Sequence, residues 1–391
     1  MSAPAKTAAS DEVELKPVRT TRDLKRFIDL PYRLYRNDPY WVPPLRIAQK
    51  DILDKRKHPF YRTSDAEMFL AFRAGRVVGR IMAILNRAHN EFHNEHAGFF
   101  GFFEVERDAD AARALLESAC EWLRSRGADV VRGPVNPSTN YECGLLVDGF
   151  DSSPRVMMTY NPRYYAELIE ACGFRKAVDL FAYDISTHYF IRSEKLARVA
   201  ERLKKKDRIR VREVNKKDFK NEVQIVRRVY NDAWSNNWGF VPVSEAEFDH
   251  LAKDLKQLVD PRIVLIAEQE TEPGKYRPVG FFLAVPDINL AFKKVRDGRL
   301  LPFGLLKLLW YSRKISFIRI ITMGVVKSIQ PMGAGAVFLS EIQWRAPAFG
   351  YPDGEMSWVL ENNLMMNRAA EMIGGRLAKT YRIYERAASE R

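Results

Sequence analysis

A glycine-containing segment near residue 330 has the residue types and spacing of an anion-binding turn. Gln330, Gly333 and Gly335 form the pattern Q-x-x-G-x-G between an apolar run expected to be a strand and a run expected to be a helix. Glycine lets the backbone approach a ligand closely, and the first turn of a helix offers unpaired N–H groups to a pyrophosphate. A tight turn that only packs a strand on a helix has the same pattern.

Two other segments carry side chains that suit the binding of a substrate. Residues 133–165 interleave asparagine and carboxylate side chains with glycine and proline just after an expected strand, and residues 234–245 concentrate aromatic side chains. A turn-rich loop whose asparagines bond to the backbone, and a plain apolar core, explain the same patterns. The candidate substrate-binding residues are Asn136, Asn140, Trp234, Asn237, Trp238 and Phe240.

Histidine and cysteine form no pattern that indicates a metal site or a covalent nucleophile. His89 and His93 have the i, i+4 spacing of helical metal ligands and His96 follows, but the segment has no HExxH motif and no carboxylate in register. We therefore expect a polar loop there and no metal. The chain has three cysteines without paired spacing, which fits a reducing compartment.

The most basic part of the chain is also rich in leucine. Residues 289–319 contain eight lysines and arginines against one aspartate, a net charge of +7, with a leucine-rich run that ends at Trp310 and is too short to span a bilayer. This composition is typical of a helix that binds anionic lipid. A covering helix with solvated basic ends has the same composition. Nucleic acid is disfavoured because the basic residues lie among leucines rather than stacking aromatics.

One order of expected elements occurs twice along the chain, which predicts two tandem α+β domains with mixed sheets. The second half, from residue 209 to residue 385, repeats the order of the first. We expect a disordered N-terminus at 1–14, a first domain at 15–206 and a second domain at 207–391 that carries the insertion 289–319. In the first half, strands are predicted at 67–75, 76–85, 98–106, 129–136 and 175–186, and helices at 108–128 and 161–174.

Length and composition fit a globular protein of about two domains. The chain has 391 residues, 46% of them hydrophobic, and 63 lysines and arginines against 50 acidic residues, which gives a net charge of +13. This excludes a collagenous, coiled-coil or largely disordered chain. The positive charge favours an anionic partner. The N-terminus has no apolar core, so it is not a signal peptide.

The strand, glycine turn and helix near residue 330 resemble the GNAT superfamily of N-acetyltransferases. The resemblance implies that this turn holds the pyrophosphate of acyl-CoA, and that strand 322–326 is splayed and offers backbone groups to the pantetheine arm. The first copy has the acidic segment RDADAARA in place of the glycine turn. A negative helix entrance repels pyrophosphate, so we expect one acyl-CoA site per chain. The residues assigned to acyl-CoA are Met323, Val325, Val326, Gln330, Gly333, Ala334, Gly335 and Ala336.

Longer strings resemble a bacterial group of tandem GNAT-like proteins that includes the ceramide synthases. The strings are LPYRLYRNDPYWVPPL, GFFGFFE, GPVNPSTNYECGLLVDGFD, YNPRYY and NNWGF. The resemblance implies transfer of a long acyl chain from coenzyme A to the amine of a sphingoid base, 3-oxosphinganine or sphinganine. It also agrees with a peripheral protein at the inner face of the cytoplasmic membrane.

Transfer of an acyl group to an amine needs a base and a group that orients the acceptor. Glu361, Asp287 and Glu142 are the candidate bases, and Asn363 is a candidate for orienting the amine. Each carboxylate also has a structural explanation, as a helix cap or an ion-pair partner. Two alternatives stay open: an N-acyltransferase for an amino acid or another amine, and a binding protein that keeps the GNAT fold without its chemistry.

Overall fold

The computed structural model describes residues 12–190, 194–235, 237–330 and 333–389. These residues form two compact units. Among the described residues, unit 1 comprises 12–147, 159–177 and 382–389, and unit 2 comprises Asp148–Met158 and the described part of Val178–Tyr381. Of the N-terminus predicted to be disordered, residues 1–11 lie outside the described residues, and Glu14 already begins a strand.

Unit 1 contains an antiparallel meander that ends in one parallel strand pair. Strands β1 to β4 pair antiparallel in sequence order, β5 pairs parallel with β4, and the C-terminal part of β15 pairs antiparallel with β5. The sheet is therefore mixed, as predicted. The strands are β1 (Glu14–Pro17), β2 (Ser64–Arg73), β3 (Arg76–Asn86), β4 (Ala97–Val105), β5 (Val130–Gly133), β8 (Leu145–Asp148) and β15 (Arg376–Ala387), and β6 (Val135–Asn136) pairs with β7 (Glu142–Cys143).

The core of unit 1 lies between this sheet and helix α4 (Ala109–Arg124). The buried face of α4 carries alanine and leucine at helical spacing, and these side chains pack on β2, β3 and β4. Helix α1 (Thr21–Leu34) begins at a capping box on Thr20 and contains Pro31. The sequence analysis did not predict α1. The remaining helices are α2 (Arg46–Ile52), α3 (Arg87–His93) and α5 (Tyr164–Glu170).

The histidine segment that was predicted to be a polar loop forms helix α3. Asn86 caps this helix by accepting a hydrogen bond from the backbone N–H of His89. The buried His89 ring has its Nε2 atom 2.6 Å from Glu95 Oε1, and burial lowers the pKa of His89 to about 4. The imidazole is therefore neutral at physiological pH and packs inside unit 1.

Unit 2 repeats this plan of strand pairing. Strand β9 pairs antiparallel with β14, β14 pairs parallel with β13, and β13, β12, β11 and β10 follow as antiparallel neighbours. The strands are β9 (Arg175–Ser186), β10 (Ile209–Glu213), β11 (Val264–Glu272), β12 (Lys275–Pro286), β13 (Phe317–Val325) and β14 (Asp353–Leu360). The helices are α6 (Glu194–Lys206), α7 (Phe219–Trp234), α8 (Glu245–Lys256), α9 (Asn289–Phe292), α10 (Gly304–Ser312), α11 (Gly335–Ala348) and α12 (Leu364–Met372).

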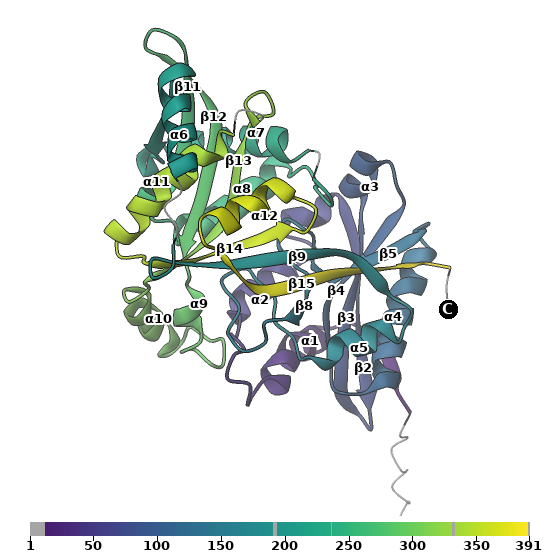
Figure 1. The fold of residues 1–391 in the computed structure, drawn as a ribbon. Helices are drawn as coiled ribbons and strands as arrows, with labels where there is room; N and C mark the ends of the chain where they lie inside the picture. The colour runs from purple at the N-terminus through teal and green to yellow at the C-terminus, as the bar shows by residue number, and fades with distance from the viewer. Residues whose placement is uncertain (1–11, 191–193, 236, 331–332, 390–391) are drawn as a thin grey trace, which may run out of the picture. The chain divides into compact units, whose positions relative to one another are not determined.

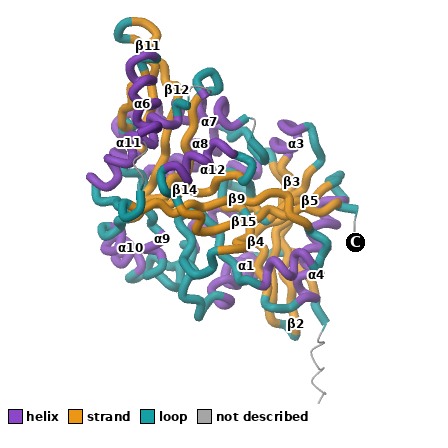
Figure 2. The backbone as a smooth tube through the Cα atoms, in the orientation of Figure 1, coloured by secondary structure: helices purple, strands orange, loops and turns teal. Residues whose placement is uncertain are grey.

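Helices cover both faces of the sheet of unit 2, and the strand residues alternate between them. Leu265 and Phe282 pack with α6, α11 and α12, whereas Ile266 and Phe281 pack with α7. Figure 1 and Figure 2 show α6 and α11 lying together beside the strands. Side chains with a period of two on a strand explain this alternation. The sheet is therefore buried on both sides in its centre.

Each unit takes its last strand from the other half of the sequence. The C-terminal residues of β15 close the sheet of unit 1, and residues 180–186 of β9 pair with β14 in unit 2. The predicted boundary between residues 206 and 207 separates the two copies of the element order. The compact units divide the chain differently. The C-terminal part of β15 belongs to unit 1 although it ends the second copy, whereas most of β9 and the segment Asp148–Met158 belong to unit 2 although they lie in the first copy.

Candidate active site

The predicted glycine turn lies between β13 and α11. The Gln330 side chain donates hydrogen bonds to the carbonyl oxygens of Val325 and Ala233, at 2.9 and 3.3 Å. Gly333 has φ +77°, a conformation that favours glycine. Helix α11 begins at Gly335, and its N-cap residue Ala334 provides no side-chain hydrogen bond. The N–H groups of Ala336 and Val337 donate to the carbonyl oxygens of Gly333 and Ala334 at 2.9 and 3.1 Å, so the positive end of the helix dipole is what this turn offers an anionic ligand.

Strands β13 and β14 separate immediately before this turn. Their parallel pairing runs from Phe317 and Asp353 to Ile320 and Met356, and β13 contains an extra residue relative to β12, Ile321. Beyond this point a cavity of about 80 Å³, the β13–β14 cavity, lies between the two strands. Its lining residues are Trp234, Asn237, Ile320, Ile321, Thr322, Met323, Met356, Ser357, Trp358, Val359, Leu360, Asn363 and Met366.

The aromatic segment after α7 contributes to one wall of this cavity. Trp234 stacks on Tyr230 with ring centroids 5.0 Å apart, and a Cβ atom on Gly324 would lie only 2.0 Å from the indole. Gly324 thus lets the tryptophan pack directly on β13. Asn237 also lines the cavity. Of the other predicted binding residues, Phe240 is buried against Tyr230 and Trp238 is half-buried, and neither lines it.

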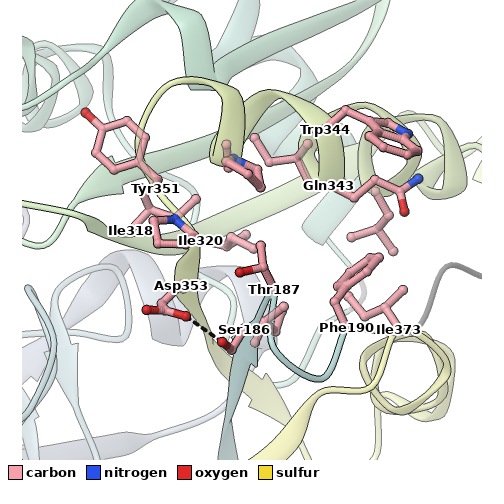
Figure 3. A pocket seen from close by; sticks show the side chains of 17 residues that line it. Ser186, Thr187, Phe190, Ile318, Ile320, Gln343, Trp344, Tyr351, Asp353 and Ile373 are labelled. Carbon is pink, nitrogen blue, oxygen red and sulfur yellow. Dashed lines mark hydrogen bonds between the residues drawn. The ribbon is translucent and has the colours of Figure 1, made fainter.

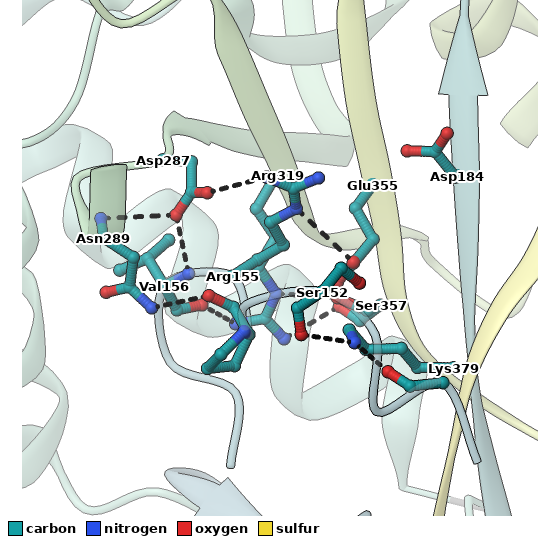
Figure 4. Close-up of polar contacts among 12 residues, drawn as sticks. Ser152, Arg155, Val156, Asp184, Asp287, Asn289, Arg319, Glu355, Ser357 and Lys379 are labelled. Carbon is teal, nitrogen blue, oxygen red and sulfur yellow. Dashed lines mark hydrogen bonds and ion pairs between the residues drawn. The ribbon is translucent and has the colours of Figure 1, made fainter. Parts of the chain in front are cut away.

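Ser357 connects the cavity to a buried carboxylate. Its hydroxyl donates a 2.7 Å hydrogen bond to Glu355 Oε1, and Arg319 Nε donates to the same hydroxyl oxygen at 2.9 Å (Figure 4). Glu355 is 2% exposed, and this burial raises the pKa of its carboxyl group. A hydroxyl at the cavity wall is therefore held between a carboxylate and a guanidinium group.

The same carboxylate belongs to a network that holds the segment 148–158 on unit 2. Asp287 accepts hydrogen bonds from the backbone N–H of Val156 at 2.8 Å and from Arg155 at 3.3 Å, and burial raises its pKa. The Nε atom of Arg155 lies 3.7 Å from Glu355. Lys379 donates to the carbonyl oxygens of Ser152, at 2.9 Å, and Gly149 (Figure 4). Asp287 thus anchors a backbone segment.

The predicted catalytic residues lie in different places. Asn363 lines the β13–β14 cavity, and its side-chain oxygen caps α12 by accepting from the backbone N–H of Met366 at 3.2 Å. Glu361 follows β14 and accepts from the backbone N–H of Asp179 at 3.1 Å, outside the cavity lining. Glu142 lies on β7 of unit 1, opposite Asn136. The structure thus brings Asn363, but not Glu361, to the cavity.

In unit 1 the corresponding space is filled by the chain itself. The parallel pairing of β4 and β5 ends at Phe99. Beyond it, Asn136 Oδ1 accepts from the backbone N–H of Phe102 at 2.6 Å, and a Cβ atom on Gly101 would lie 1.6 Å from the carbonyl oxygen of Val135. Asn136, predicted to bind substrate, makes this backbone bond. Asn140 is half-buried and donates from its backbone N–H to Ser138 Oγ at 3.2 Å.

The entrance of helix α4 in unit 1 is closed to an anion. Asp108 caps the helix by accepting from the backbone N–H of Ala111, and Arg73 binds the same carboxylate through two hydrogen bonds of 2.8 and 3.0 Å. A carboxylate already occupies the position that a pyrophosphate would need. A single acyl-CoA site per chain stays a prediction.

The sequence analysis missed Ser357, Glu355 and the arginines that surround them. The strand segment GEMSWVL places two polar residues at alternate positions among apolar ones. On a buried strand this spacing directs both side chains to one face, which is the signal that could have identified them. Their partner Arg155 comes from a distant loop, and the local sequence does not indicate this pairing.

Comparison with known proteins agrees with this geometry. No family model matches the chain. The chain is 38% identical over 386 residues to "Bacterial ceramide synthase" of Caulobacter vibrioides, covering 96% of this chain and 98% of that protein. It is 37% identical over 371 residues to "Protein YghO" of Escherichia coli, covering 93% of each.

Solved structures show the same fold at low sequence identity. A tandem GNAT protein from the clavulanic acid biosynthesis pathway superposes with a TM-score of 0.52 at 11% identity, covering 97% of this chain and 99% of that one. A GCN5-related N-acetyltransferase from Sphaerobacter thermophilus gives a TM-score of 0.51 at 14% identity, with 97% of each chain covered. The predicted tandem fold is thus confirmed.

Proposed function

This chain belongs to the tandem GNAT acyltransferase family that includes bacterial ceramide synthase, and on that premise we propose that it transfers a long acyl chain from coenzyme A to the amine of a sphingoid base. The observation that carries the proposal is the separation of β13 from β14 after Ile320, on the strand that leads through the glycine turn to the start of α11. This arrangement provides an anion site and a cavity between strands on one continuous piece of chain. The anion site fits the pyrophosphate of acyl-CoA, and the cavity fits its thioester.

The side chains of unit 2 supply the proton transfers in this proposal. Ser357 accepts a proton from the substrate ammonium group and passes its hydroxyl proton to Glu355. The free amine then forms the N–C bond as the C–S bond breaks, and its second proton leaves with the sulfur as the thiol. Backbone N–H groups of β13 beyond Ile320 are no longer paired with β14, so they suit the thioester oxygen.

The remaining predicted residues keep their proposed roles around this centre. Asn363 orients the amine from the start of α12, and Trp234 and Asn237 contact the acceptor from the wall after α7. Trp238, Phe240, Asn136, Asn140, Glu142 and Glu361 stay predictions, and each has the structural partner or position described above. Met323 lines the cavity, whereas Val325, Val326 and the residues from Gln330 to Ala336 follow it along the chain.

A membrane surface is the second proposed partner, and helix α10 is its contact. The exposed face of this insertion carries large apolar side chains, among which Leu301 is 75% exposed and Trp310 is 60% exposed. Exposed basic residues surround them: Lys294, Arg296, Arg299, Lys307, Arg313 and Lys314. Within the described part of the chain, no helix is long and apolar enough to cross a bilayer. We therefore propose peripheral binding to an anionic leaflet, where long-chain substrates reside.

The experiment that tests the function is an acylation assay on the full chain. The purified protein is incubated with palmitoyl-CoA and a panel of amines, and products are identified by mass spectrometry. We expect N-acyl sphinganine or N-acyl 3-oxosphinganine, and little product from glycine or other short amines. Faster acylation of amino acids would replace this acceptor with the amino-acid alternative. Absence of any amide product would contradict the proposed activity.

A further inference from the structure

A second cavity of unit 2 lies beneath the C-terminal half of α11, on the face of the sheet that α12 also covers. This α11 cavity has a volume of about 200 Å³. Figure 3 shows Ile318 and Ile320 of β13 on one side and Phe190 and Ile373 on another. The aliphatic and aromatic side chains of its wall include Ile185, Phe190, Ile318, Ile320, Leu339, Ile342 and Ile373.

Few polar groups enter this wall, and a pair of them is already bonded. Ser186 donates a 2.5 Å hydrogen bond to Asp353 (Figure 3). The side-chain oxygen of Gln343 is buried without a hydrogen-bond partner, while its NH₂ group donates to the Ser340 carbonyl. The cavity therefore suits an apolar chain better than a charged or strongly polar ligand.

The α11 cavity adjoins the β13–β14 cavity at a shared residue. Ile320 lines both cavities and is the last residue of β13 that pairs with β14. From Ile318 in one wall to Thr322 in the other is roughly 13 Å along the strand, at about 3.3 Å per residue. Helix α11 begins at the proposed pyrophosphate site and covers this second cavity with its later turns.

We propose that the α11 cavity receives the distal part of the fatty acyl chain whose thioester lies between β13 and β14. The inference rests on the proposed function and adds the determinant of acyl-chain length. One extended ligand would follow α11 from its first turn to its last, and Ile320 would be the point where the chain leaves the splayed strands. The tail of the amine is the competing occupant, and the test separates the two.

The proposal is tested by filling the cavity from a small residue. Ala346 lines the cavity, is 6% exposed and lies on α11, so Ala346→Phe occupies the space without removing a contact. The matched control is Ala348→Phe, because Ala348 is an exposed residue of the same helix and lies outside the lining. Ile342→Ala is the companion variant, because it removes side-chain volume from the same wall and so enlarges the cavity.

Binding of octanoyl-, dodecanoyl- and palmitoyl-CoA is measured by calorimetry, and kcat/KM is measured for the same series. We expect Ala346→Phe to lose about fourfold for each methylene group that it no longer buries, so the loss grows with chain length. Octanoyl-CoA should change less than twofold, the control should match the parent, and Ile342→Ala should favour the longest chain.

Equal losses for all three thioesters, or no loss for palmitoyl-CoA, would overturn the acyl assignment. A loss that depends on the length of the amine instead would assign the cavity to the acceptor. Calorimetry measures how thioester binding depends on acyl-chain length without an acceptor amine. It therefore tests the acyl assignment even where no amide forms. Failure of the proposed function would therefore appear as binding without transfer, which leaves the measured selectivity intact.

Discussion

At the residue scale, Ser357 joins the β13–β14 cavity to the buried carboxylate of Glu355. Ser357→Ala removes the hydroxyl that is proposed to relay a proton, and Glu355→Gln removes the proposed acceptor of that proton. We expect each variant to lower kcat about 100-fold, in the range of general acid–base catalysis. Affinity for acyl-CoA should stay within about twofold, since neither side chain is assigned to that ligand. Steady-state kinetics and calorimetry measure the two effects.

The control for this pair is Asp287→Asn. Asp287 belongs to the same buried network and binds the same segment, but it has no hydrogen bond with Ser357 among those that join the described residues. Thermal unfolding of all three variants separates loss of stability from loss of chemistry. If Asp287→Asn slows turnover as much as Glu355→Gln does, the network only supports the fold and the proton role is lost.

The pH profile gives a readout that a structural role would not move. Burial raises the pKa of Glu355, and only its ionised form can accept a proton, so activity should decline as pH falls through this raised value. The charged groups near Glu355 are Arg155, Arg319, Asp287 and Lys379, and the buried Tyr381 hydroxyl lies among them. Glu355→Gln should lose this acid limb, whereas Asp287→Asn should keep it.

A substitution at Gly333 tests the proposed anion site at the start of α11. Gly333→Glu places a carboxylate at the proposed pyrophosphate position and should weaken acyl-CoA binding by about 3 kcal/mol, roughly 100-fold. Gly350→Glu is the matched control: Gly350 also has positive φ, +88° against +77°, and follows the other end of the same helix with open space around it. Calorimetry that finds equal affinity for both variants would contradict the site, as would two CoA molecules per chain.

At the element scale, helix α10 presents large apolar side chains to solvent next to basic ones. Leu306 and Trp310 are 64% and 60% exposed, so replacing both by Asp should change folding stability little while it removes lipid contact. We expect sedimentation with anionic liposomes to fall at least about tenfold, and binding of the parent to weaken with salt. Ile47→Asp, at an exposed apolar residue of α2, is the control.

Charge reversal at Lys307, Arg313 and Lys314 separates the electrostatic part of this binding. Each basic residue near an anionic surface contributes about 1 kcal/mol, so three reversals to Glu should abolish most of the attachment. The leucines remain in place in this variant, so residual binding measures the apolar part. Equal sedimentation of the parent with neutral and anionic liposomes would contradict the assignment to an anionic leaflet.

Most elements could be predicted from the sequence because their patterns are local. Helix α4 follows from alanine and leucine at helical spacing between Asp108 and Gly127, and the β2–β3 hairpin follows from alternation around Gly75. The prolines at 39, 43 and 44 argue against a long helix after residue 30, and helix α1, which ends at Leu34 before them and contains Pro31 in its last turn, was not predicted. The glycine turn was found because its spacing is local as well.

The buried half of the candidate site could not be predicted, because its parts are distant in the sequence. Arg155 reaches Asp287 and Glu355, more than 130 residues away, and Lys379 binds the carbonyl of Ser152. A carboxylate next to an arginine in space has no signature in either local segment. Glu361 was favoured because it follows a strand, but its carboxylate is bonded to the backbone of β9.

At the scale of the whole molecule, the two halves of the chain exchange their last strands. Local alternation identifies both β9 and β15 as strands but does not specify their neighbours, since pairing depends on the surrounding sheet. The copy boundary in the sequence therefore does not separate two folding units. Residues 207–391 alone lack β9, α6 and the segment 148–158 that complete unit 2. We expect that fragment to be poorly folded.

Two tyrosines of β15 provide a matched test of this exchange. Tyr381 and Tyr384 are both fully buried and lie three residues apart, yet Tyr381 belongs to unit 2 and Tyr384 to the core of unit 1. Replacing either by Ala should cost about 3 to 5 kcal/mol in its own unit. Hydrogen exchange should then rise in α4 for Tyr384→Ala and in β13 and β14 for Tyr381→Ala, because Tyr381 lies near Arg319 of β13 and Glu355 of β14.

If the chain divided at the copy boundary instead, both tyrosines would belong to the second copy, and both alanine variants would raise exchange in β13 and β14 alone. Tyr384→Phe is the mild control: it keeps the buried ring and removes only the 2.8 Å hydrogen bond to Glu170, at a cost of about 1 kcal/mol. Exchange that rises in the same elements for both alanine variants would show that the last strands are not exchanged.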